Sequence, residues 1–293
     1  MGDGTYRTSK RRAKNRCEKG IKKMRIEDFT DADINEKPLD RMVTDGGFVG
    51  IFRNIACVGD SLSSGEFEST NADGNRGYHD MFEYSWGQYL ARMAGCNVRN
   101  FSRGGMSARE YITSFAEEKG FWNPELKCEA YIIALGVNDL NERSTLPVGS
   151  IDDICPEDYR KNKPTFAGQY AHIITRYKEI QPDAKFFLMT TPKHDRAEVT
   201  PENEAKKDAM RKLLYDFADY FDNTYVLDIR KYGVAYDAEF RRRFFLGGHM
   251  NACGYLLTAR IVASYIDYII RHNYRDFNQV SFIGKPMKNT VDV

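Results

Sequence analysis

The chain has 293 residues, 42% of them hydrophobic, and its 43 basic and 42 acidic side chains nearly cancel. Such a chain can bury one large core, so we expect one main domain with extensions. No apolar run approaches the roughly 18 residues of a membrane span, and no apolar segment follows the basic N-terminus as in a signal peptide. We therefore expect a cytoplasmic protein without a membrane span.

The N-terminal segment is unusually basic. Residues 1–25 hold ten Lys or Arg and two acidic residues, which leaves 33 basic and 40 acidic residues in the rest of the chain. A basic arm can contact nucleic acid, but this one has no apolar face and only one aromatic residue, Tyr6. We interpret it as a solvated tail and predict no nucleic-acid partner. The six cysteines are widely spaced without a Cys-x-x-Cys pair, so we also predict no metal site and no organic cofactor.

Apolar runs and helical patterns alternate along the chain, which is typical of a parallel sheet with helices on both faces. The predicted strands lie at 54–58, 97–101, 130–136, 185–191 and 224–229. The predicted helices lie within 82–95, 107–120, 165–180, 202–221 and 251–272. Residues 69–81 are predicted to form a Gly-rich, aromatic loop. These elements predict a doubly wound α/β domain.

Reactive residue types stand where the predicted strands end. Ser61 follows the first strand, the pair Gly104 and Gly105 follows the second, and Asn138 follows the third. His249 lies between the fifth strand and the last helix. Ligands of a doubly wound sheet bind beyond the carboxyl ends of its strands, so these residues should converge. A histidine can activate a serine hydroxyl, and backbone N–H groups with an Asn amide can stabilise an oxyanion. The pattern therefore predicts acyl transfer.

Four segments, "GDSLS", "NFSRGGMS", "GVND" and "GHMN", resemble the sequence blocks of the GDSL or SGNH hydrolase family, in the family's order. The resemblance covers residues 54 to about 272. It implies a three-layer α/β/α, flavodoxin-like fold with a five-stranded parallel sheet in the order 2-1-3-4-5. It also implies that Ser61 is the nucleophile and that His249 is the general base. Ser61, Gly105 and Asn138 would be the oxyanion donors.

The domain boundaries follow from this resemblance. We predict a basic tail and lead-in segment over residues 1–50, an SGNH hydrolase domain over residues 51–275, and a C-terminal extension over residues 276–293.

One position departs from the family pattern. The family usually has an Asp three residues before the histidine, and here that residue is Leu246. Such an Asp orients the imidazole and stabilises its cation. The main-chain carbonyl of Leu246 could take this role, and Asp237, Asp228 or Glu239 are the carboxylate alternatives.

The sequence thus predicts a serine hydrolase that cleaves carboxylic esters through an acyl-enzyme, as an esterase, deacetylase or lipase-like acylhydrolase. Arg103 and His194 are candidates for binding the substrate, a small-molecule or carbohydrate ester. An acyltransferase would use the same residues. Because of Leu246, a catalytically silent carbohydrate-binding protein of this fold is a further alternative. The sequence specifies neither the acyl chain, nor the alcohol, nor the oligomeric state.

Overall fold

The computed structural model describes residues 33, 35–194 and 199–290. The chain divides into two units, Met1–Glu36 and Lys37–Val293, and the fold described here is that of the second unit. Residues 37–50 and 276–290 belong to this same unit. The basic segment 1–25 lies outside the described residues.

A five-stranded sheet forms the centre of the unit. Its strands are β1 (Asn54–Gly59), β4 (Asn97–Ser102), β5 (Ala130–Ala134), β6 (Lys185–Met189) and β7 (Thr224–Leu227). They lie in the order β4-β1-β5-β6-β7, and every neighbouring pair is parallel. This confirms the predicted sheet and its order 2-1-3-4-5. Gly59 pairs with Ser102 on one side and with Ala134 on the other, so three adjacent strands end at the same level.

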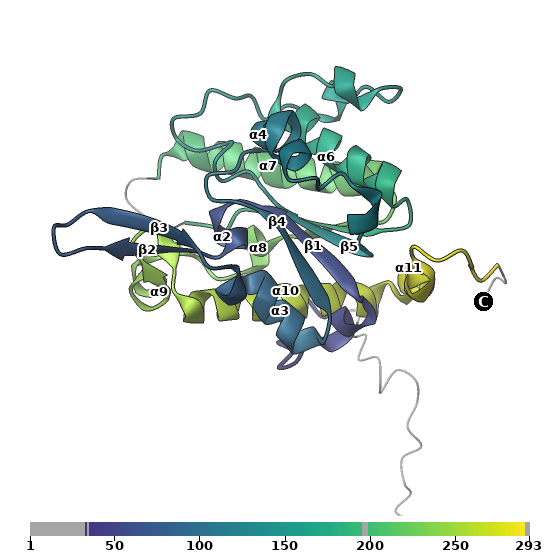
Figure 1. The fold of residues 1–293 in the computed structure, drawn as a ribbon, viewed down its shortest axis with the longest axis horizontal. Coiled ribbons are helices and arrows are strands. Elements are labelled where there is room, and N and C mark those ends of the chain that lie inside the picture. The colour runs from purple at the N-terminus through teal and green to yellow at the C-terminus, as the bar shows by residue number, and fades with distance from the viewer. Residues whose placement is uncertain (1–32, 34, 195–198, 291–293) are drawn as a thin grey trace, which may run out of the picture. The chain divides into compact units, whose positions relative to one another are not determined.

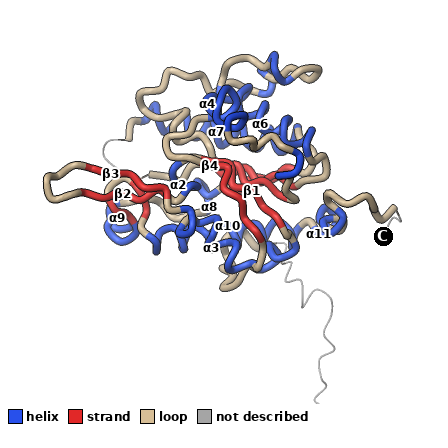
Figure 2. The backbone as a smooth tube through the Cα atoms, viewed as in Figure 1, coloured by secondary structure: helices blue, strands red, loops and turns tan. Residues whose placement is uncertain are grey.

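Helices cover both faces of the sheet, as Figures 1 and 2 show. Side chains alternate along β1: Ile55 and Cys57 join the core of one face, and Ala56 and Val58 join the core of the other. The first face is covered by α3 (Trp86–Ala94) and α10 (Ala252–His272). The second is covered by α4 (Ala108–Glu110), α5 (Ala116–Glu118), α6 (Phe166–Ile180) and α7 (Pro201–Tyr220), with a π-helical segment, Tyr111–Phe115, between α4 and α5. The fold is therefore the predicted three-layer α/β/α arrangement.

Two antiparallel hairpins lie outside the central sheet. The first pairs β2 (Glu66–Thr70) with β3 (Arg76–Asp80), and Figure 1 shows it extending away from the sheet. The second is the short pair β8 (Phe245–Leu246) and β9 (His249–Met250). β2 packs against both β8 and β9. The prediction of a loop over residues 69–81 is thus wrong for residues 69–70 and 76–80, which lie in the two strands of a hairpin, whereas residues 71–75 form its tip.

Short helices complete the unit. α8 (Ile229–Tyr232) follows β7, and α9 (Ala238–Phe244) leads into β8. Near the C-terminus lie α11 (Tyr274–Phe277) and a 3-10 turn, Val280–Phe282, and another 3-10 turn, Gly47–Ile51, precedes β1.

α10 is the one helix among the described residues that is long and apolar enough to cross a membrane. Of its most apolar stretch, 67% is buried, because the helix packs against α3 and the sheet. A buried core helix meets this test of length and composition as readily as a membrane span does.

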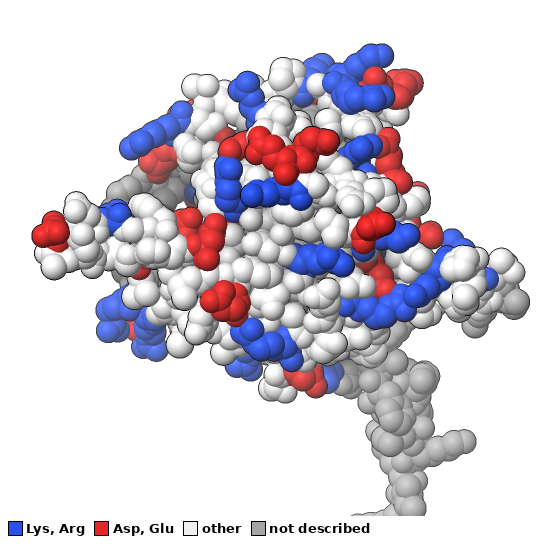
Figure 3. Space-filling model, viewed as in Figure 1, with Lys and Arg blue, Asp and Glu red and all other residues white. Residues whose placement is uncertain are grey.

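Charged side chains of both signs are interspersed on the face of the molecule drawn in Figure 3. On the helices, Arg176 pairs with Glu179 at 2.9 Å and Lys212 pairs with Asp216 at 2.8 Å. Exposed pairs of this kind contribute little to stability.

Candidate active site

Ser61 is the first residue of α2 (Ser61–Ser64), a single helical turn that begins directly after β1. Asp60 caps this turn, and its carboxylate accepts a hydrogen bond from the N–H of Leu62 at 3.1 Å. Asp60 is 2% exposed, and burial raises the pKa of its carboxyl group to about 7. A buried cap thus holds the half-buried Ser61 at the carboxyl edge of the sheet.

The predicted oxyanion donors come from the loops after three adjacent strands, β4, β1 and β5. Gly105 has a φ of +72°, a left-handed conformation that favours glycine. Asn138 donates from Nδ2 to the carbonyl of Met106 at 3.0 Å, which ties the loop after β5 to the loop after β4. An Asn amide carries two hydrogens, so one stays available. Among the described residues, the N–H groups of Ser61 and Gly105 have no acceptor.

His249 lies in β9 and contacts a carboxylate at each of its ring nitrogens. Nδ1 forms a hydrogen bond with Oε1 of Glu68 at 2.8 Å. Nε2 lies 3.0 Å from Oε1 of Glu66, a contact that is an ion pair when the ring is protonated. The same Glu68 oxygen accepts the N–H of Gly248 at 2.7 Å, which ties the hairpin to the chain just before the histidine. All three side chains of the histidine and the glutamates are mostly buried, between 9% and 17% exposed.

The partner of Nδ1 of His249 is thus Glu68. It is none of the predicted candidates Leu246, Asp237 and Asp228. Leu246 is the β8 partner of His249, and its side chain is exposed. Asp237 caps α9 by accepting the N–H of Phe240 at 2.7 Å. Glu239, the remaining alternative, pairs with two arginines of its own helix.

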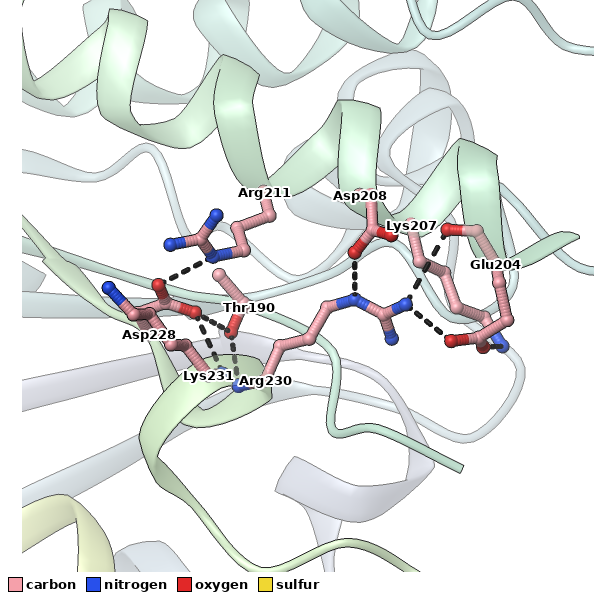
Figure 4. Close-up of polar contacts among 8 residues, drawn as sticks. All are labelled: Thr190, Glu204, Lys207, Asp208, Arg211, Asp228, Arg230 and Lys231. Atoms are coloured by element: carbon pink, nitrogen blue, oxygen red, sulfur yellow. Dashed lines mark hydrogen bonds and ion pairs between the residues drawn. The ribbon is translucent and has the colours of Figure 1, made fainter. Parts of the chain in front are cut away.

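Asp228 is engaged in a separate polar network, drawn in Figure 4. Its carboxylate is fully buried and accepts hydrogen bonds from Arg211 at 2.6 Å and from the Tyr215 hydroxyl at 3.0 Å. It also accepts the N–H of Lys231 at 3.2 Å and contacts the Thr190 hydroxyl at 3.5 Å. A buried carboxylate with these partners stabilises the end of β7.

Glu66 and Glu68 are the residues that sequence reasoning missed. They alternate with Phe67 along β2, and this period of two places both carboxylates on one face. Phe67 faces the other way and packs against Tyr84 and Tyr255, with ring centroids 6.0 and 5.5 Å apart. The alternation in "EFEST" was a signal for a strand, but nothing in it indicated His249 as the partner.

Ser61, Asn138 and His249 line one cavity of about 560 Å³. The predicted substrate-binding residue His194 lines the same cavity. Arg103 does not line it: its guanidinium pairs with Glu110 and lies over the ring of Phe115, 5.0 Å from the centroid.

A second, smaller pocket of about 30 Å³ adjoins this cavity. Leu62, Val137 and Tyr236 line both spaces. The small pocket is otherwise lined mainly by apolar side chains, among them Trp86 and Met189. It therefore offers a narrow apolar recess next to the cavity that Ser61 lines.

Among the residues that the structure describes, no group of three or more His, Cys, Asp or Glu side chains is arranged to hold a metal ion. Glu66 and Glu68 lie at different nitrogens of His249, so the three side chains do not converge on one point.

The GDSL-like lipase/acylhydrolase family matches residues 57–257, more than half of the chain. The chain belongs to this family. The matched range contains Ser61, Gly105, Asn138 and His249. Membership in this family of acylhydrolases makes the protein an esterase of the GDSL type, as predicted. No curated protein sequence matches the chain.

Solved structures share the fold of this GDSL-family member. A family two carbohydrate esterase from Clostridium thermocellum, in complex with cellohexaose, has a TM-score of 0.53 and 14% identity over 74% of this chain and 64% of its own. A carbohydrate acetylesterase from Sinorhizobium meliloti has a TM-score of 0.51 and 14% identity over 74% and 99%. A protein from Lactobacillus plantarum has a TM-score of 0.53 and 16% identity over 74% and 97%. At these identities the similarity shows the fold.

Proposed function

We propose that this esterase cleaves carboxylic esters by a serine mechanism, through an acyl-enzyme on Ser61. One observation carries the proposal. Ser61, Asn138 and His249 line the same cavity, and Nδ1 of His249 has a mostly buried carboxylate as its partner. A nucleophile, a base, an orienting acid and oxyanion donors are the parts that acyl transfer by serine requires.

In the first half of the reaction, Oγ of Ser61 forms a bond to the carbonyl carbon while Nε2 of His249 takes the hydroxyl proton. The negative charge that develops on the carbonyl oxygen is stabilised by the N–H groups of Ser61 and Gly105 and by the amide of Asn138. The tetrahedral intermediate then expels the alcohol oxygen, which takes the proton from Nε2. The second half repeats these steps with water as the nucleophile and releases the carboxylic acid.

Glu68 gives His249 the tautomer that this mechanism needs. A carboxylate at Nδ1 keeps the N–H on that nitrogen, so that Nε2 presents its lone pair to Ser61. When Nε2 takes the proton, the same carboxylate stabilises the resulting cation. Glu68 therefore takes the role that the resemblance assigns to an Asp at position 246.

The substrate that fits best is an ester of a short acyl group with a hydroxyl-rich alcohol, such as an acetylated carbohydrate. The recess of about 30 Å³ that adjoins the cavity has room for about one or two groups the size of a methyl group. The larger cavity is lined by polar side chains, including Asn141, Arg143 and Asn203, which suit a sugar. The two carbohydrate esterases of the same fold support this substrate class.

The test compares the wild type with Ser61→Ala. We expect Ser61→Ala to lose labelling by a fluorophosphonate probe and to lose at least about 10⁴-fold in hydrolysis of p-nitrophenyl acetate. The wild type should cleave the acetate faster than the hexanoate and should release acetate from an acetylated oligosaccharide. Ser69→Ala, on the exposed part of β2, is the matched control. Labelling and hydrolysis that persist in Ser61→Ala would overturn the proposal.

A further inference from the structure

The Nε2 side of His249 carries a contact that the mechanism above does not use. Glu66 and Glu68 project from the same face of β2 and reach the two ring nitrogens, at 3.0 and 2.8 Å. Both contacts are ion pairs when the ring is protonated, but only the contact at Nδ1 also has the geometry of a hydrogen bond. The serine mechanism needs only the first of these carboxylates, so the second requires its own explanation.

Packing holds the Glu66 side chain in this place. A Cβ atom on Gly104 would lie 2.0 Å from Oε2 of Glu66, so the carboxylate fits over the backbone of the loop that carries Gly105. On the other side, the hydroxyl of Tyr255 donates to the main-chain carbonyl of Glu66 at 2.6 Å. The carboxylate is therefore fixed between the oxyanion loop and the histidine, and only 13% of the side chain is exposed.

The charge of Glu66 acts on the protonated state of His249. A carboxylate oxygen 3.0 Å from Nε2 repels the lone pair of a neutral ring and attracts the N–H of a cationic one. Glu66 therefore favours the state of the histidine in which Nε2 has already taken the serine proton.

We propose that Glu66 is a second positioning residue of the esterase, which stabilises the cation of His249 from the Nε2 side and so sets the pH range in which the histidine acts as a base. This inference rests on the proposed serine mechanism. It assigns different tasks to the two glutamates. Glu68 fixes the orientation of the ring, and Glu66 adjusts how readily the ring takes and releases its proton.

Most of the other ionisable groups around this contact are acidic. Those that face Glu66 or His249 are Glu68 on β2, Asp80 on β3, Asp60 before α2, Tyr255 on α10 and Tyr78 on β3. Burial raises the pKa of Glu66, the charge of His249 lowers it, and Asp80 and Glu68 raise it further. Glu66 thus loses its charge as the pH falls through its raised pKa, and its effect on His249 is present above that range.

The experiment measures the rate of fluorophosphonate labelling of Ser61 as a function of pH. In Glu66→Gln, which keeps the size of the side chain and removes its charge, the half-maximal rate should move to lower pH by about one unit. The plateau at high pH should fall by a few-fold, because the cation formed on attack has lost one of its two carboxylates. Glu66→Asp keeps the charge and should retain most of the wild-type profile.

Two controls separate this effect from general damage. Asp73→Asn removes one negative charge from the exposed tip of the same hairpin and should leave the profile unchanged. Thermal unfolding of Glu66→Gln and Glu66→Asp should match that of the wild type. If the Glu66→Gln profile has the wild-type midpoint, the inference is wrong even though labelling still depends on Ser61. If labelling does not depend on Ser61 in any variant, the serine mechanism itself fails.

Discussion

The carboxyl edge of the central sheet and the β2–β3 hairpin contribute to the candidate site in different ways. The edge presents Ser61, Gly105 and Asn138 from the loops after three adjacent strands, whose ends are level because of the parallel register. The hairpin presents Glu66 and Glu68, which reach His249 from a part of the chain about 180 residues away. One contribution follows from sheet topology, and the other depends on how an outlying element packs.

Under the proposed mechanism, Nδ1 of His249 needs a carboxylate, but this carboxylate does not need to come from a particular sequence position. Leu246 occupies the place of the usual family Asp, yet Nδ1 has a partner at 2.8 Å. The hairpin can supply it because Phe67 anchors β2 against Tyr255 of α10 while the alternate side chains face the histidine. Substitutions in the hairpin and substitutions at the sheet edge should therefore impair catalysis in different ways.

The largest effect is expected from the hairpin side. Glu68→Gln should lower kcat by about 10³- to 10⁴-fold, because an amide neither stabilises the histidine cation nor enforces the correct tautomer. KM should change little, since Glu68 does not line the cavity. Steady-state hydrolysis of p-nitrophenyl acetate measures both constants.

Asp73→Asn serves as the control for Glu68→Gln, because it changes the charge of the hairpin away from the histidine. A Glu68→Gln enzyme with wild-type kcat would mean that the hairpin merely covers the site.

A smaller effect is expected from the sheet side. Asn138→Ala should lower kcat by about 10²- to 10³-fold, the usual loss for one oxyanion donor. The pH profile should keep its wild-type midpoint, because Asn138 does not contact His249. The hydrogen bond to Met106 is also lost, so the unfolding temperature should be measured beside the rate. A shifted midpoint in Asn138→Ala would contradict the separation of tasks between edge and hairpin.

The sheet and its edge could be predicted because their signals are local. Each strand is a short apolar run, and Ser61, Gly105 and Asn138 follow within a few residues of a strand end. Parallel topology then brings the strand ends together without further information.

The partner of His249 could not be predicted for the opposite reason. β2 and β3 are short strands with few apolar residues, and most of β3 is exposed, so their pattern resembles a loop. The contact between Glu68 and Nδ1 exists only after the hairpin packs on β8 and β9. Asp228 was a candidate because it is an acid at a strand end, and only the structure reveals that Arg211 and Tyr215 already satisfy it.

The smallest effect is expected from restoring the family residue. Leu246 lies directly opposite His249 in the β8–β9 hairpin, and its side chain is 48% exposed, so an aspartate fits there without a cavity or a clash. Leu246→Asp alone should change kcat by less than about threefold, because Nδ1 already has a buried carboxylate partner and an exposed second one adds little.

The same substitution should become important when Glu68 is removed. In the Glu68→Ala background, Leu246→Asp offers Nδ1 a new carboxylate, and we expect it to recover at least about tenfold of the lost kcat. This gain, absent in the wild-type background, is the interaction that a double-mutant cycle measures. Leu246→Asn is the matched control, because it has the same shape without the charge. Equal gains from Leu246→Asp in both backgrounds would show that Glu68 and residue 246 serve His249 independently, and the hairpin would then not be the substitute for the family aspartate.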